Sequence, residues 1–241
     1  MHNSIEQAFT DLLQWCRERE FAGYDPFDAL NSRVLNATPL RHSRTARLIS
    51  TQIVKRSPVN LRPWLLVPQQ KNAKGLALFA LSALSNHRRL KTSVTEEQAR
   101  SLLAQLLEMQ ISGYHGAAWG YNFDWQSRNF YAPQGTPMIV PTAFAARAFI
   151  EGYETLKDPS YLQTALSVGD FILKDLNRTV DSDDELCFSY SPIDQTRIFN
   201  ASLFAVETLA RLSRFTQSEE FCALAQRAAR YVANKQRDDG S

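Results

Sequence analysis

The sequence predicts an all-α fold, an α/α toroid built from stacked helical hairpins. Apolar residues recur at helical spacing through most of the 241 residues. Two hairpins also repeat with an offset of 60 residues, which places Phe144 and Ala145 in register with Phe204 and Ala205. Each hairpin has an apolar face too large to leave in water, so neighbouring hairpins must stack to bury it.

Helices are expected near residues 5–20, 43–55, 74–86, 94–110, 141–156, 159–176, 198–214 and 218–236. In the first of them, Ala8, Leu12, Leu13 and Trp15 are expected to face inward. Asp158 followed by Pro159 is a helix cap with proline at the first helical position.

We expect a single domain over residues 1–241, with repeats near 74–110, 141–176 and 200–236. The long loops 111–140 and 177–197 each follow the second helix of a hairpin, so they should emerge on the same face of the stack. Alternating apolar residues over 186–190 predict a short β-arm in the second loop.

Composition excludes several classes of protein. The net charge of +2 is too small to favour nucleic acid. The N-terminus lacks a signal-peptide pattern, and no apolar run is long enough to span a membrane. The three cysteines lack metal-ligand spacing, and Cys16 and Cys222 are expected to be buried free thiols. We therefore expect a cytoplasmic protein with no cofactor and no metal.

The loop over residues 113–137 is the best candidate site. It combines many aromatic side chains with one carboxylate and one arginine. Flat rings interleaved with polar groups are typical of a sugar-binding cleft, because apolar sugar faces stack on rings while hydroxyls take polar partners. The alternative is structural: Trp119 and Trp125 fill the ring axis, and Asp124 caps a turn.

Asp124 is the acid–base candidate in this loop, and Asp194 lies in the other loop on the same expected face. Two carboxylates across a cleft could act as general acid and base, although Asp194 could equally cap the helix near residue 198. His115 is either a base, a substrate contact or a structural residue. The candidate binding residues are Trp119, Tyr121, Asn122, Trp125, Arg128, Tyr190 and Asn200.

Two motifs are similar to those of terpene cyclases and prenyltransferases. Asp181, Asp183 and Asp184 match the DxDD string of class II terpene cyclases, but their polar neighbours favour a solvated turn. Near the C-terminus, Tyr231, Gln236 and Gly240 resemble the QW repeat of prenyltransferases and squalene cyclases. Because a similar turn occurs earlier in the chain, we interpret this repeat as a generic hairpin end.

Residues 119–126, 135–142, 188–194 and 200–203 carry a further resemblance. Over a little more than half of its length, the chain resembles bacterial α/α-toroid proteins associated with polysaccharide biosynthesis. The architecture is also similar to six-hairpin glycosidases and sugar epimerases, which close a ring of twelve helices. About eight helices are expected here, so the resemblance implies an incomplete ring, truncated at its C-terminal side.

Two hypotheses follow. The first is a carbohydrate-active or carbohydrate-binding protein whose partner is an oligosaccharide or polysaccharide, with Arg128 meeting an anionic sugar. The second is a non-catalytic helical scaffold; a terpene-cyclase-like enzyme is less favoured. In either case an open edge of the toroid would expose apolar surface, which predicts self-association.

Overall fold

The computed structural model describes residues 2–239, and it describes side chains from residue 4 onward. These residues form two compact units. The first contains the residues up to Asn72 together with Asn122–Tyr131, and the second contains Ala73–Tyr121 and the chain from Ala132 onward. The repeats that predicted one domain over residues 1–241 all lie in the second unit. Gly240 of the QW-like motif lies outside the described residues.

The first unit has mostly short elements. They are α1 (His2–Glu18), η1 (Asp28–Asn31), α2 (Arg33–Asn36), η2 (Pro39–His42), α3 (Arg44–Arg56), β1 (Trp125–Gln126) and the start of β2 (Tyr131–Ala132). Ser32 and Ser43 begin α2 and α3, because each serine hydroxyl accepts a hydrogen bond from the first turn of its helix. A buried ion pair of 2.7 Å between Arg62 and Asp28 fixes the following loop to η1.

The orientation expected for α1 is wrong. Leu12 is 61% exposed and Trp15 is 53% exposed, and Ala8 is exposed as well. Of the side chains described in this helix, Cys16 is the one that is buried. The spacing of apolar residues identifies which face of a helix is apolar, but it does not say whether another element covers that face.

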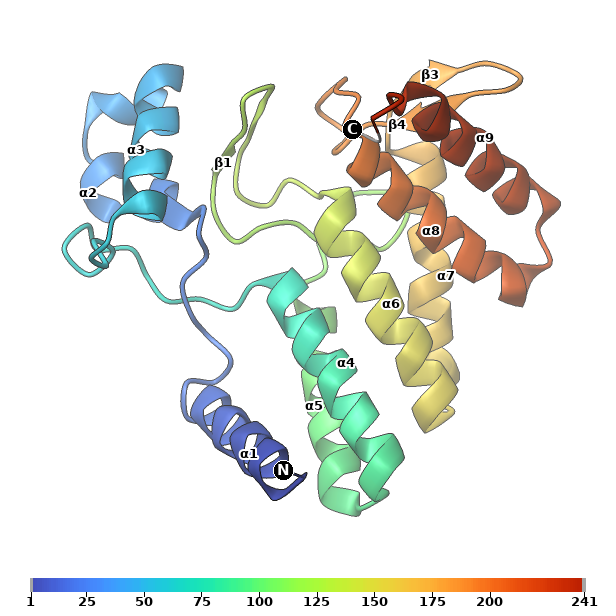
Figure 1. Cartoon of the computed structure of the whole chain (residues 1–241), viewed down its shortest axis with the longest axis horizontal. Helices are drawn as coiled ribbons and strands as arrows, with labels where there is room; N and C mark the ends of the chain where they lie inside the picture. Colours follow the sequence, from blue (N-terminus) through green and yellow to red (C-terminus); the bar gives the residue numbers. More distant parts are fainter. Residues whose placement is uncertain (1, 240–241) are drawn as a thin grey trace. The chain divides into compact units, whose positions relative to one another are not determined.

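The second unit contains the hairpins. Its helices are α4 (Ala73–Leu90), α5 (Ser93–Glu108), α6 (Ile139–Leu156), α7 (Pro159–Lys174), α8 (Phe199–Thr216) and α9 (Glu219–Lys235). Consecutive helices pair as α4–α5, α6–α7 and α8–α9, and α6 packs between α4 and α8 (Figure 1). The eight helices predicted from sequence, including α1 and α3, are therefore confirmed, as is the all-α hairpin architecture.

The repeat extends to the turns of the hairpins. Lys157 and Gln217 are both left-handed C-caps, with φ of 58° and 53°. Each is followed by a residue whose side chain caps the next helix, Asp158 for α7 and Ser218 for α9. The capping that Asp158 and Pro159 predicted is confirmed.

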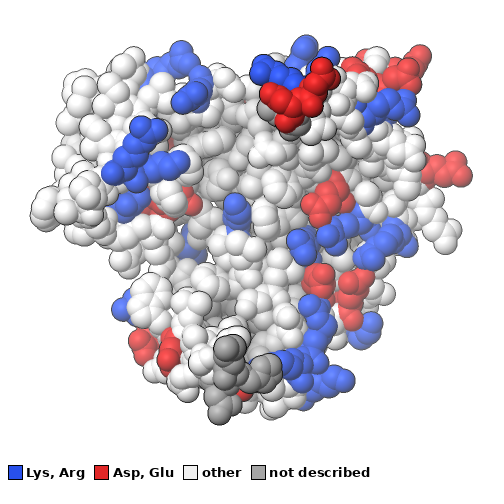
Figure 2. Space-filling model, in the orientation of Figure 1, with Lys and Arg blue, Asp and Glu red and all other residues white. Residues whose placement is uncertain are grey.

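The predicted β-arm is also present. Strands β3 (Arg178–Asp181) and β4 (Leu186–Phe188) pair antiparallel, and the acidic turn between them carries the DxDD string. Asp181 is paired with Arg227 of α9, and Asp184 with Arg230. Acidic and basic side chains are accordingly mixed at this corner of the unit (Figure 2, upper right). The Arg227 guanidinium lowers the pKa of Asp181, which is the opposite of what a proton-donating cyclase acid needs.

Cys16 and Cys187 are buried and Cys222 is exposed, so the burial expected for Cys222 is wrong. Within the described part of the chain, no helix is long and apolar enough to cross a membrane.

Candidate functional site

The two long loops of the second unit meet where α6 and α8 begin. The hydroxyl oxygens of Tyr121 and Tyr190 are 3.3 Å apart, and the backbone carbonyl of Tyr190 accepts a 2.9 Å hydrogen bond from the amide of Ile139. Burial raises the pKa of Tyr190, so its hydroxyl keeps its proton. The prediction that these loops emerge on one face is confirmed by this contact.

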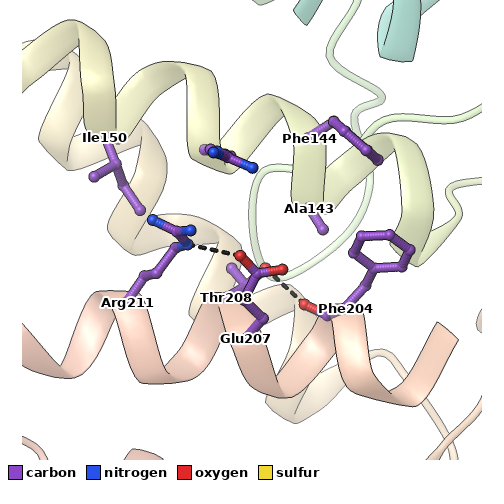
Figure 3. Close-up of a pocket in the computed structure, with 8 residues that line it drawn as sticks. Ala143, Phe144, Ile150, Phe204, Glu207, Thr208 and Arg211 are labelled. Atoms are coloured by element: carbon purple, nitrogen blue, oxygen red, sulfur yellow. Dashed lines mark hydrogen bonds and ion pairs between the residues drawn. The ribbon is translucent and has the colours of Figure 1, made fainter. Parts of the chain in front are cut away.

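A groove runs between α6 and α8 below this loop contact (Figure 3). It is open to solvent. Its lining residues are Ala143, Phe144, Arg147, Ile150, Phe204, Glu207, Thr208 and Arg211. Phe144 and Phe204 approach each other across the groove, with ring centroids 5.5 Å apart and planes inclined at 48°. Both rings lie in the second turn of their helices, and thus at the end from which the loops enter.

The polar groups of the groove are distributed unevenly. Glu207 accepts a 2.9 Å hydrogen bond from the Nε of Arg211, and the Thr208 hydroxyl donates to the carbonyl of Phe204 (Figure 3). The Lys74 ammonium lies 5.1 Å from the centroid of the Phe144 ring. Arg147 is exposed and forms no ion pair with any residue that the structure describes.

Ion pairs connect α6 to α4 and to α8 toward the ends of α6 and α8 that lie away from the loops. Arg88 of α4 donates to Glu151 of α6 at 2.7 Å, and Arg214 of α8 donates to Glu154 of α6 at 2.9 Å. These arginines are neutralised by their partners. Polar groups that can still accept a ligand therefore lie toward the loop end of the groove.

Asp124 lies in the first unit, in a separate pocket. Its carboxylate accepts a 2.5 Å hydrogen bond from the hydroxyl of Tyr131. The guanidinium of Arg47 stacks 4.2 Å above the Tyr131 ring and donates to Gln126 at 2.8 Å. The pocket is open to solvent and is lined by Leu30, Leu35, Asn36, Leu40, Arg41, Arg47, Ser50 and Asp124.

Burial raises the pKa of Tyr131 to about 12, and the neighbouring carboxylate of Asp124 adds to the rise. The phenol therefore stays protonated at neutral pH and donates to Asp124. The guanidinium of Arg47 stacks on the ring of Tyr131, and the Tyr131 hydroxyl donates to Asp124. The Asp124 carboxylate therefore has a defined orientation, which a proton-transferring group requires.

Trp119, a predicted sugar platform, is a core residue. It is 0% exposed, its indole nitrogen donates to the carbonyl of Leu106 at 2.7 Å, and its ring packs against Phe149. Its backbone nitrogen and oxygen are both held by the Thr142 hydroxyl. No face of the ring remains open to a ligand.

Asp194 is 4% exposed, and its two oxygens accept hydrogen bonds from the backbone and hydroxyls of Ser191 and Thr196. Ile198 rather than Asp194 is the N-cap of α8. The carboxylate therefore organises the turn that follows Tyr190.

His115 has a side chain that is 63% exposed. Its backbone nitrogen and its Nδ1 both contact the carboxylate of Asp175, at 2.9 and 2.8 Å. This pair connects the start of the first long loop to the end of α7.

The remaining candidates are divided between the units. Asn122 donates to Gln70 at 3.0 Å, and its Oδ1 is buried without a hydrogen-bond partner among the described residues. Trp125 is half-buried against Phe130, with centroids 5.4 Å apart. Arg128 is exposed, and its carbonyl accepts from Arg44. Asn200 is exposed in the first turn of α8.

Sequence reasoning missed Phe144, Phe204 and Arg147 as site residues. A signal for them exists: the two phenylalanines occupy equal positions in the 60-residue repeat, and a charged residue follows each by three positions. That spacing places ring and charge on one face of each helix. In the described residues, no group of His, Cys, Asp and Glu is arranged to hold a metal.

The geometry of repeated hairpins with a loop-side groove defines an α/α toroid. No protein-family model matches the chain, and comparison with curated proteins finds no match. Solved structures do match. A glycoside hydrolase family 76 mannosidase from Bacteroides thetaiotaomicron matches with a TM-score of 0.51 at 11% identity. This match covers 88% of this chain and 58% of the mannosidase. A cellobiose 2-epimerase from Bacillus thermoamylovorans gives 0.53 at 11% identity, with 89% and 62% covered.

An α-1,6-mannanase variant of Salegentibacter sp. HEL1_6, in complex with α-1,6-mannotetrose, has a TM-score of 0.51 at 14% identity. The match covers 90% of this chain and 63% of that one. These similarities show a shared α/α-toroid fold. The chain spans less than two thirds of the length of these structures.

Proposed function

We propose that this chain is a carbohydrate-active or carbohydrate-binding protein and that the groove between α6 and α8 holds a sugar ring. The observation that carries the proposal is the Phe144–Phe204 pair beside the exposed guanidinium of Arg147. Sugars have apolar faces that stack on aromatic rings and hydroxyls that need hydrogen-bond partners, and this groove offers both. The fold is shared with a mannosidase and an epimerase, which supports a sugar as the class of ligand.

The sequence resemblance adds that the sugar belongs to a bacterial polysaccharide, in a biosynthetic role. On this proposal the ligand is an oligosaccharide or polysaccharide segment. The free thiols of Cys16 and Cys187 are compatible with the reducing cytoplasm that we expect.

Removal of either ring tests sugar binding in the groove. Phe204→Ala and Phe144→Ala should each weaken oligosaccharide binding about 5- to 30-fold, because each removes apolar contact worth about 1 to 2 kcal/mol. The matched control is Phe215→Ala, since Phe215 forms a similar ring pair with Tyr153 at the opposite end of α8. Equal loss of binding in the control and the groove variants, measured by calorimetry, would contradict the assignment.

We propose Asp124 as the group that moves a proton if the protein is an enzyme, acting on a ligand in its own pocket of the first unit. Its fixed orientation and the charged lining of its pocket support this role. Asp194, by contrast, is proposed to position the loop around Tyr190, and His115 to hold the first loop through Asp175. Asp124→Asn should abolish turnover of a cleaved or epimerised oligosaccharide while binding stays within about twofold. Retained turnover in this variant would eliminate Asp124.

One observation favours the alternative of a non-catalytic scaffold, namely the open apolar face of α1. Ile5, Leu12 and Trp15 are all more than half exposed on this helix. A helix face of this kind is typical of a surface that meets another protein. A scaffold would bind sugar or protein, show no turnover with any oligosaccharide, and be unaffected by Asp124→Asn.

A further inference from the structure

Arg147 is the unusual residue of the α6–α8 groove. It lies one turn after Phe144 on a helix whose other residues in this stretch are mostly buried and apolar. Three other arginines of α4 and α8 have a carboxylate partner: Arg88 has Glu151, Arg211 has Glu207 and Arg214 has Glu154. Arg147 has none among the described residues, although it lines the groove.

The groove carries positive charge at Arg147, midway along α6. Glu207 is neutralised by Arg211, which leaves Arg147 as the excess charge one turn from Phe144. A partly enclosed groove concentrates this field more than a flat surface does. A neutral ligand would gain nothing from it, whereas an anionic ligand would be attracted and oriented.

A guanidinium provides parallel N–H donors in a plane, and a carboxylate accepts them in the same plane. A ring that packs against the Phe144–Phe204 pair and carries a carboxylate would engage both the aromatic and the charged features of the groove. Such a ligand is a uronic acid residue of an acidic glycan.

We propose that the sugar held in this groove is acidic, and that Arg147 selects it by pairing with the carboxylate of a uronic acid residue. The inference depends on the proposed function, because it names the substrate class of the same groove. It also replaces Arg128, the arginine expected from sequence to meet an anionic sugar, with a residue of the toroid itself.

The test compares two ligands that differ in one group. Calorimetric titration uses an oligogalacturonide and its carboxyl-reduced counterpart, with the complete chain at low and moderate salt. The acidic oligomer is expected to bind at least about 10-fold more tightly, the typical value of one charge-assisted hydrogen bond. This preference should shrink as salt rises, because the groove is open to solvent.

Variants assign the preference to one residue. Arg147→Gln should remove most of the preference, because it weakens binding of the acidic oligomer far more than binding of the reduced oligomer, while Arg147→Lys should restore part of it. Arg214→Gln is the matched control: it removes the same charge from the neighbouring helix, but from a neutral pair with Glu154, so it should change the preference less than twofold. Since Arg147 is exposed, its variants should fold normally.

The outcomes separate this inference from the function on which it depends. Equal binding of both oligomers, lost on Phe204→Ala, would overturn the inference and leave sugar binding in place. Binding of neither oligomer, with neutral oligomannosides also failing, would overturn both. Equal binding of polyglutamate would show a response to charge alone. A preference for the acidic oligomer that survives Arg147→Gln would show that the carboxylate binds elsewhere. Either result would overturn the assignment to Arg147.

Discussion

Substitution of Trp119 by phenylalanine separates a core tryptophan from a sugar-stacking one. The indole nitrogen donates to the carbonyl of Leu106 at 2.7 Å, and this carbonyl also accepts a hydrogen bond from the amide of Met109. Trp119→Phe therefore removes one hydrogen bond without leaving the carbonyl unpaired. The cost of that loss is about 1 kcal/mol.

The smaller ring adds a cavity term. Trp119 is fully buried against Phe149, so the lost part of the indole leaves a void worth about 1 kcal/mol. The total destabilisation is then about 2 kcal/mol, which corresponds to a fall in Tm of roughly 4 to 8 °C for a chain of this size. Binding of sugar at a temperature where the variant is folded should be unchanged.

Differential scanning calorimetry and titration with oligosaccharide measure the two effects. Trp64→Phe is the control, because Trp64 is 76% exposed and should change the free energy of unfolding by less than about 0.5 kcal/mol. A Trp119→Phe variant with unchanged Tm and sugar binding weakened more than tenfold would refute the placement of this side chain in the core.

Three further predictions concern the scaffold. Gly120→Ala should destabilise the chain by about 1 to 3 kcal/mol in chemical denaturation, because an added Cβ would overlap the backbone carbonyl of Thr136. Gly23→Ala is the control, because a Cβ at Gly23 meets no atom and should not destabilise the chain. Equal destabilisation by both variants would contradict the packing of this loop. Hydrogen bonds from Ser160 hold the pKa of Asp158 below its usual value, so its contribution to stability is present above about pH 4 and is lost as pH falls through the lower folded pKa. Asp158→Ala should flatten the stability–pH curve below pH 4, and an unchanged slope would count against this cap. Finally, Leu12→Glu should weaken any self-association through α1 at least about tenfold in sedimentation experiments, because it places a charge on the apolar face; unchanged association would place the contact elsewhere.

The spacing of apolar residues predicted the hairpins because each helix packs against its neighbours along a regular apolar face. In α8, buried residues from Ala201 to Leu212 follow the 3.6-residue repeat. The local caps at Lys157, Asp158, Gln217 and Ser218 end and restart the helices. These signals depend on near neighbours in sequence. Residue types alone are therefore enough to recover them.

The site was harder to predict because loop burial depends on distant partners. Trp119 and Phe123, both in the first long loop, are fully buried. Gly116 and Gly120 permit this, since a Cβ at either position would overlap the backbone of Ser167 or Thr136. Close approach of this kind leaves no periodic pattern. Consequently the sequence predicts a ligand for the loop aromatics and gives no site role to Phe144 and Phe204.

A crystal structure of the chain with a saturating acidic oligosaccharide tests the central claim most directly. The account predicts a sugar ring in the groove between α6 and α8, in contact with Phe144 and Phe204 and with its carboxylate on the guanidinium of Arg147. A sugar bound in any other place, with this groove left to solvent, would contradict it.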